Sequence, residues 1–221
     1  MNERRGEVLV AIALALRSSS LLFGKIAMRT MGPFLTIGCR FTIAFVIIAI
    51  LFRRHLTRID ARTLFHCALI GITFFLAMLT EMMGLQTTPS SVTAFLEGTV
   101  VILVPAMACI LKRKLPDRIT VASSVVCLIG VAFLTLKGDR LGFTSGELLV
   151  LLGTVWYSLS VIVTDVAAKN DDLMVVSIYQ LLFIAIFGFI GAFIFEDIRM
   201  PQSGTEWGAV LALAVICSCV G

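Results

Sequence analysis

Long apolar stretches separated by short polar segments run along the whole chain. With about 20 residues as the length of a membrane span, eight apolar runs stand out. They lie near residues 7–28, 34–52, 63–84, 90–111, 119–137, 146–168, 173–195 and 206–221. The pattern predicts an all-α, polytopic membrane bundle of seven full transmembrane helices and a truncated eighth, because the last run stops after about 16 residues. We therefore expect the sequence to be a fragment of a longer protein.

Composition supports a membrane protein and argues against a soluble domain. Hydrophobic residues make up 59% of the chain and charged residues only 14%, whereas soluble domains carry about 25% charged residues. The net charge of +4 comes from Lys and Arg in short clusters between the apolar runs. Such clusters are typical of loops at a membrane surface, so we expect lipid as a partner and no nucleic acid.

The distribution of positive charge predicts the orientation of the chain. Eleven Lys and Arg residues, in the segments 4–5, 53–62, 112–118 and at 169, fall on one side of the predicted bilayer, against five on the other. The positive-inside rule then places the N-terminus in the cytoplasm, with the chain crossing the plasma (inner) membrane several times.

The two halves of the chain resemble each other at a constant offset of 140 residues. The first copy has Gly6, Glu7, Leu9, Val10, Ser18, Ser20, Ala27 and Ile50, and the second has Gly146, Glu147, Leu149, Val150, Ser158, Ser160, Ala167 and Ile190. Five spans separate the two starts, so the second copy enters the membrane from the opposite side. This predicts an inverted repeat of five-helix units, 1–138 and an incomplete 146–221. Chance similarity between apolar segments is the alternative.

Several short motifs accompany this repeat. They are Ser18-Ser19-Ser20 with Lys25, Arg40-Phe41, Gly84-Leu85-Gln86-Thr87-Thr88-Pro89-Ser90-Ser91 before Ala94-Phe95-Leu96, Val104-Pro105, and Lys112-Arg113-Lys114-Leu115. In order and spacing they resemble the EamA family of the drug/metabolite transporter superfamily. The resemblance implies two five-helix repeats, ten helices in a full-length protein, and secondary transport of small metabolites. Two positions depart from the family pattern, Leu16-Arg17 and Glu97.

Ionisable residues inside the predicted spans are the candidates for a substrate site, because each one is costly in a membrane. Arg17 falls near the middle of the first span, whereas Arg40, Glu81 and Glu97 fall in the middle or outer half of the next three. A purely structural role, in which the four charges neutralise one another, is the alternative. At the repeat offset Arg17 corresponds to Tyr157 and Arg40 to Gln180.

These six residues give a sharper hypothesis about the substrate site. Arg17 or Arg40 would attract an anionic group of a small-molecule substrate, and Glu97 would carry a coupling proton. Tyr157 and Gln180 would line the same cavity from the second half of the chain.

The sequence also limits the other functional classes. It contains no nucleotide-binding, metalloprotease or serine-hydrolase motif, and its six cysteines lie in apolar runs without CxxC spacing. We therefore expect no catalytic residues, metal or cofactor. The favoured function is transport of a small metabolite, such as an amino acid or related organic solute, by alternating access. A proton-coupled multidrug exporter of cationic compounds and an intramembrane lipid-modifying enzyme stay as alternatives, and no pattern sets an oligomeric state.

Overall fold

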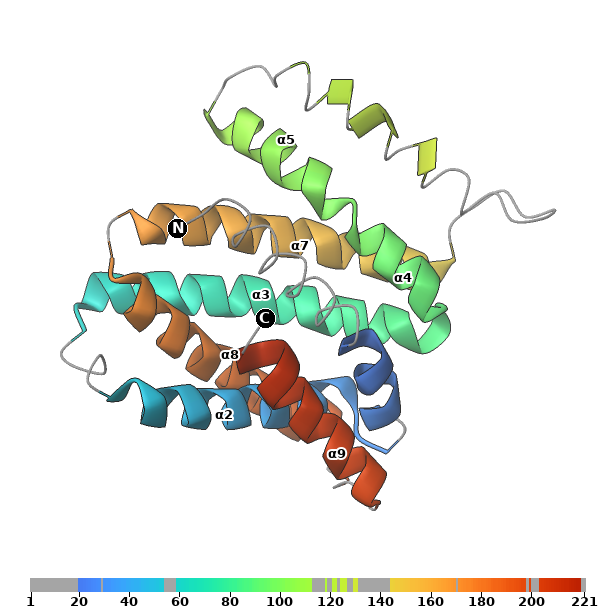
Figure 1. Ribbon diagram of the computed structural model, residues 1–221, viewed down its shortest axis with the longest axis vertical. Helices are drawn as coiled ribbons and strands as arrows, with labels where there is room; N and C mark the ends of the chain where they lie inside the picture. The colour runs from blue at the N-terminus through green and yellow to red at the C-terminus, as the bar shows by residue number, and fades with distance from the viewer. Residues whose placement is uncertain are drawn as a thin grey trace, which may run out of the picture.

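The computed structural model describes residues 20–28, 30–53, 59–112, 118, 121–122, 124–126, 129–130, 144–169, 171–197, 199 and 203–219. All regular structure in this part of the chain is helical (Figure 1). The helices are α2 (Pro33–Leu51), α3 (Ala61–Thr87), α4 (Ser90–Glu97), α5 (Val100–Lys112), α7 (Ser145–Ala168), α8 (Leu173–Phe195) and α9 (Gly204–Ala212), which continues as a π-helical segment, Leu213–Cys219. A further helical stretch covers residues 20–27. The predicted all-α class is thereby confirmed for the described residues.

Five helical stretches are long and apolar enough to cross a membrane, with α4 and α5 together forming one of them. They coincide with the apolar runs expected near 34–52, 63–84, 90–111, 146–168 and 173–195. The run expected at 206–221 contains a shorter apolar helix, Gly204–Val215. Most of the runs expected at 7–28 and 119–137 lies outside the described residues, so the predicted total of seven spans and a truncated eighth stays a prediction.

Polar residues at the helix starts explain where these helices begin. Thr144 and Glu147 form a capping box before α7, and Ser203 and Glu206 form another before α9. In each box the two side chains satisfy backbone N–H groups that a helix start leaves without partners. Asp172 caps α8 by accepting a hydrogen bond from the N–H of Met174.

The start of α2 is capped from a distance. The carboxylate of Glu196, just beyond the end of α8, accepts hydrogen bonds from the backbone N–H groups of Phe34 at 2.9 Å and Leu35 at 3.0 Å. A carboxylate is favourable here because the N-terminus of a helix carries partial positive charge. Gly32 leaves room for it, since a β-carbon at this position would overlap the Glu196 carboxylate.

Two pairs of antiparallel helices form the centre of the bundle. In Figure 1, α3 lies between α7 and α2, while α8 packs across α2 and α3. Along the α3–α7 pair, a β-carbon on Gly84 would come within 2.6 Å of the Gly146 carbonyl oxygen, and one on Gly153 within 3.1 Å of the Ala77 oxygen. Small residues let helices approach closely in a membrane, where dispersion contacts replace the hydrophobic effect as the driving force.

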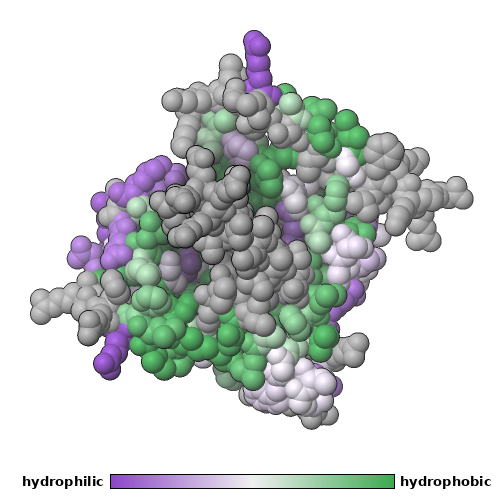
Figure 2. All heavy atoms as spheres, viewed as in Figure 1, coloured by the Kyte–Doolittle hydropathy of each residue, from purple (hydrophilic) through white to green (hydrophobic). Residues whose placement is uncertain are grey.

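The outer surface of the bundle is suited to lipid. Figure 2 shows one face of the molecule, where hydrophobic residues make up much of the described surface and hydrophilic ones lie toward its margins. Large apolar side chains such as Ile50, Val101 and Phe193 are highly exposed. Buried hydroxyls satisfy themselves within their own helices, as when Ser158 donates to the carbonyl of Thr154 at 2.7 Å. This pattern is what a hydrocarbon solvent requires.

The fourth predicted span is broken rather than continuous. α4 ends at Glu97 and α5 begins at Val100, and at the break Thr99 donates its N–H to the carbonyl of Leu96 at 3.1 Å. Pro105 lies inside α5 without ending it. The interruption therefore falls beside Glu97, one of the charged residues singled out by the sequence.

Candidate functional site

A cavity of about 190 Å³ lies where the central helices meet. Its lining residues come from the 20–27 helix, α2, α3, α7, α8 and the π-helical segment: Ser20, Arg40, Phe41, Phe74, Met78, Tyr157, Gln180, Leu181, Ile184 and Ser218. One side of this main cavity is polar and the other is apolar. Such a mixture is typical of sites that hold and orient a small organic molecule.

Arg40 provides positive charge in the main cavity. Its residue is only 6% exposed, and its Nε donates a hydrogen bond to the hydroxyl of Ser218 at 2.7 Å. The guanidinium carbon also lies 5.1 Å from the centre of the Phe41 ring, within the range of a cation–π interaction. An arginine has five N–H donors, so the bond to Ser218 uses only one of them.

The π-helical segment positions Ser218 for this contact. The Ser218 hydroxyl donates to the carbonyl of Leu213, five residues earlier, at 3.1 Å. Its proton is thereby committed to the backbone, and its oxygen accepts from Arg40. Single turns of π-helix are rare and occur often at functional sites, because they re-aim one side chain.

Three aromatic rings form one wall of the main cavity. The rings of Phe41 and Phe74 meet edge to face with centres 5.9 Å apart, and Phe74 lies 5.8 Å from Tyr157. Both arrangements fall in the range favoured by ring quadrupoles. The wall ends in the Tyr157 hydroxyl, which brings a polar group to the edge of an apolar surface.

A much smaller cavity, of about 10 Å³, gathers the two carboxylate candidates. It is lined by Glu81 from α3, Glu97 from the end of α4 and Tyr157, together with Val100, Val150, Gly153 and Thr154. A space of this size holds about one water molecule. Tyr157 lines both this cavity and the main one, so it separates Arg40 from the two carboxylates.

A third cavity, of about 220 Å³, adjoins the main one between α3, α7 and α8. It shares Phe74, Tyr157 and Gln180 with the main cavity and adds Ser160 and Thr164 from later turns of α7. These additions lie toward the end of α7 that leads to Asp171. The cavity system therefore extends from Arg40 in that direction.

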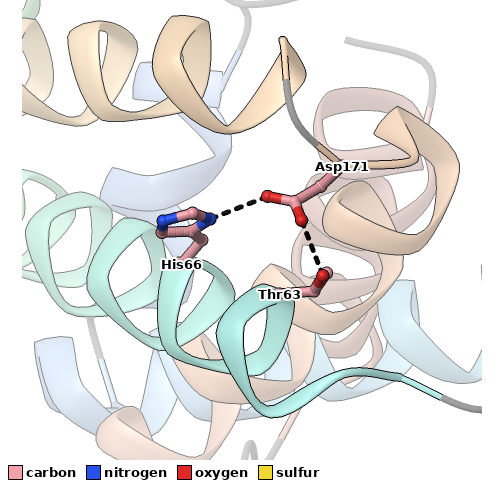
Figure 3. A network of polar contacts seen from close by, with 3 residues as sticks. All are labelled: Thr63, His66 and Asp171. Carbon is pink, nitrogen blue, oxygen red and sulfur yellow. Dashed lines mark hydrogen bonds and ion pairs between the residues drawn. The ribbon is translucent and has the colours of Figure 1, made fainter.

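At that end of α7 a polar network joins α3 to the loop before α8 (Figure 3). Asp171 accepts a hydrogen bond from the Thr63 hydroxyl at 2.6 Å and lies 2.7 Å from Nδ1 of His66. These two hydrogen bonds, and the nearby charge of Arg62, lower the pKa of Asp171 below its ordinary range. Among the described residues no three His, Cys, Asp or Glu side chains gather closely enough to hold a metal ion.

The structure brings five of the six candidate residues to two neighbouring cavities. Arg40, Tyr157 and Gln180 line the main cavity, and Glu81, Glu97 and again Tyr157 line the small one. The sixth candidate, Arg17, lies outside the described residues. The four charges expected to share one region are thus divided between two compartments on either side of the Tyr157 ring, as far as the described residues go.

Sequence reasoning missed most of the apolar lining and Ser218. The repeat offset contained a usable signal for them, because Phe41 corresponds to Leu181 and Met78 to Ser218, and all four line the main cavity. Apolar residues fill every span, however, so periodicity alone did not separate these from residues that face lipid.

Comparison with known proteins agrees with this architecture. A solved crystal structure of a protein matches with a TM-score of 0.71 and 19% identity, over 99% of this chain and 77% of that one. At this identity the match establishes a shared fold. No curated protein matches the chain. The model of the EamA-like transporter family matches residues 4–136. The chain, with its apolar helices around a polar cavity, therefore belongs to the EamA-like transporter family of the drug/metabolite transporter superfamily.

Proposed function

We propose that this protein is a secondary transporter that moves a small metabolite, such as an amino acid or related organic solute, across the plasma membrane by alternating access. The main cavity carries the proposal, because a buried arginine, an amide, hydroxyls and an aromatic wall converge there inside an apolar bundle. Polar groups at this depth are expensive and are usually retained for function.

The cavity lining supports an inverted repeat, with units 1–138 and 146–221. At the offset of 140 residues, three pairs of positions fall on the same cavity: Arg40 with Gln180, Phe41 with Leu181, and Met78 with Ser218. Transporters built from inverted repeats bind their substrates at the interface between the repeats. The pairing is what a pseudo-two-fold axis through the cavity would produce.

Two apolar clusters give the repeat independent support. One cluster contains Phe23, Ala27, Cys39, Ile43 and Val210. A second contains Val163, Ala167, Tyr179, Phe183 and Ile70, the positions 140 residues away from each of these. Both clusters pack a helix of one unit against a helix of the other. The resemblance therefore extends from the sequence to the packing between the units.

Proton coupling is proposed for Glu97. It follows the helix break between α4 and α5 closely and lines a water-sized cavity next to Tyr157. A carboxylate that changes between a dry and a hydrated environment can bind and release a proton during transport. Arg40 is the proposed anion-binding residue, with Gln180 and Tyr157 as further substrate contacts. Arg17 and Glu81 stay candidates for the same pathway.

Reconstitution into liposomes tests the transport function. Uptake of labelled amino acids, organic acids and organic amines should exceed that of empty liposomes for at least one class, and it should saturate. Tyr157→Ala should reduce this uptake strongly, whereas Tyr179→Phe, which alters a ring outside the cavities described here, should not. Preferred uptake of amines would favour a cationic drug exporter, and turnover of lipid without solute flux would favour an enzyme.

The orientation is tested by cysteine labelling from outside intact cells. An N-terminus in the cytoplasm and an inverted second unit require a cysteine at Asn2 to be protected and one at Ser145 to react. Reaction at both sites, or at neither, would contradict the inverted repeat.

A further inference from the structure

The main cavity combines one cation with an otherwise neutral wall. Arg40 is the only charged side chain among its described lining residues. The other polar groups are the hydroxyls of Ser20, Tyr157 and Ser218 and the amide of Gln180. Because arginine stays protonated in proteins and charges interact more strongly away from water, the cavity favours a guest that brings negative charge.

The remaining wall favours an apolar group on the same guest. Phe41, Leu181 and Ile184 are buried side chains that face the cavity together with Phe74 and Met78. A volume of about 190 Å³ gives room for roughly six to twelve non-hydrogen atoms, since a water molecule takes up about 30 Å³. The fitting guest is therefore short, with a charged end and an apolar end.

A second charge on the guest would be poorly accommodated. An α-amino acid carries its ammonium group on the carbon next to the carboxylate, so its binding to Arg40 would bring a cation beside the guanidinium. Glu81 and Glu97 line a separate cavity of about 10 Å³ on the other side of Tyr157. That space holds about one water molecule, so these carboxylates are poorly placed to pair with such an ammonium.

We infer that the site selects a small monoanionic carboxylate with an apolar tail over the zwitterionic amino acid of the same carbon skeleton. Arg40 binds the carboxylate, and the wall of Phe41, Phe74 and Leu181 holds the tail. The inference rests on the proposed transport function and adds the charge class of its substrate.

Three ligands with related skeletons test the inference. They are 4-methylpentanoate, leucine, which adds the ammonium, and 3-methylbutylamine, which lacks the carboxylate. In titration calorimetry on the purified protein, 4-methylpentanoate should bind at least about tenfold more tightly than leucine, and the amine should not bind. Equal or tighter binding of leucine would overturn the inference.

Flux measurements separate this inference from the transport function. In liposomes, 4-methylpentanoate should enter saturably and leucine should compete weakly. Saturable leucine uptake that 4-methylpentanoate does not inhibit would keep transport and overturn the charge selectivity. Uptake no faster than in empty liposomes, for these and all other solutes, would overturn the transport function itself.

Variants assign the selectivity to residues. Arg40→Gln should weaken 4-methylpentanoate binding at least about tenfold, whereas Arg53→Gln, at the exposed end of α2, should leave it unchanged. Gln180→Glu adds a carboxylate to the main cavity and should shift the preference toward leucine. Retained selectivity in both cavity variants would remove the assignment. If Arg40→Gln fails to fold, the ligand comparison on the unaltered protein still decides the inference.

Discussion

Gly38 of α2 and Gly188 of α8 lie in direct backbone contact where the two helices cross. A β-carbon on Gly188 would come 2.7 Å from the backbone nitrogen of Gly38 and 2.9 Å from its α-carbon. Backbone atoms cannot move aside as a side chain can, so α2 and α8 hold this distance only without that carbon. The contact lies beside the cluster of Ile37, Phe41, Leu181 and Ile184, which includes part of the cavity wall.

Gly188→Ala should therefore destabilise the protein and disturb the cavity. We expect a loss of about 1–3 kcal/mol from overpacking, seen as a lower midpoint of thermal unfolding in detergent. Gly208→Ala is the matched control, because nothing lies within 4 Å of a β-carbon there. It should be neutral or slightly stabilising, since alanine favours helix more than glycine. Equal effects of the two substitutions would contradict the close contact.

Glu196→Gln should weaken the cap on α2. The substitution removes the charge that faces the helix N-terminus and leaves one acceptor oxygen for two N–H groups, so we expect a loss of about 1 kcal/mol. Thermal unfolding in detergent measures it. Asp197→Asn, one residue further along and exposed, is the control and should change the midpoint little. An unaltered midpoint for Glu196→Gln would show that this cap contributes nothing.

Asp171→Asn should destabilise the protein in a pH-dependent way. Hydrogen bonds from Thr63 and His66 lower the native pKa of Asp171. The ionised carboxylate therefore stabilises the fold fully above its unfolded pKa, and this contribution disappears as the pH falls through the native pKa. The difference in unfolding midpoint between wild type and Asp171→Asn should be constant down to about pH 5 and shrink below about pH 4.

The exposed Asp165–Lys169 pair provides the comparison for Asp171. Its two atoms lie 2.7 Å apart, as close as those of Asp171 and His66, but the side chains are 54% and 62% exposed. Water screens such a pair, so Asp165→Asn should leave the midpoint almost unchanged at every pH. A larger effect there than at Asp171 would mean that burial does not set the strength of the network.

Glu97→Gln should abolish transport that is driven by a pH gradient while leaving solute exchange across liposomes that lack a gradient. The reason is that the amide cannot bind and release a proton, whereas Arg40 and the rest of the main cavity are unchanged. Asp60→Asn, an exposed carboxylate before α3, should keep both activities. Full gradient-driven uptake by Glu97→Gln would exclude this residue as the proton carrier.

Much of the fold follows from the sequence because lipid imposes simple rules. A span needs about 20 apolar residues with satisfied backbone groups, so runs such as 63–84 and 173–195 located α3 and α8 closely. The capping residues Thr144, Asp172 and Ser203 marked helix starts. The break beside Gly98 was indicated only weakly, since glycine and proline occur in many unbroken membrane helices, as Pro105 does here.

The sequence by itself determined which residues carry charge inside the membrane, because each such residue stands out against an apolar background. It also determined the offset that relates Arg40 to Gln180. Only the tertiary structure decided that the Tyr157 ring separates Arg40 from Glu81 and Glu97, and that Ser218 reaches Arg40 across 178 positions of chain. The physical reason is that helix contacts in lipid depend on close packing of small residues such as Gly38 and Gly188, and a hydropathy pattern does not contain this geometry.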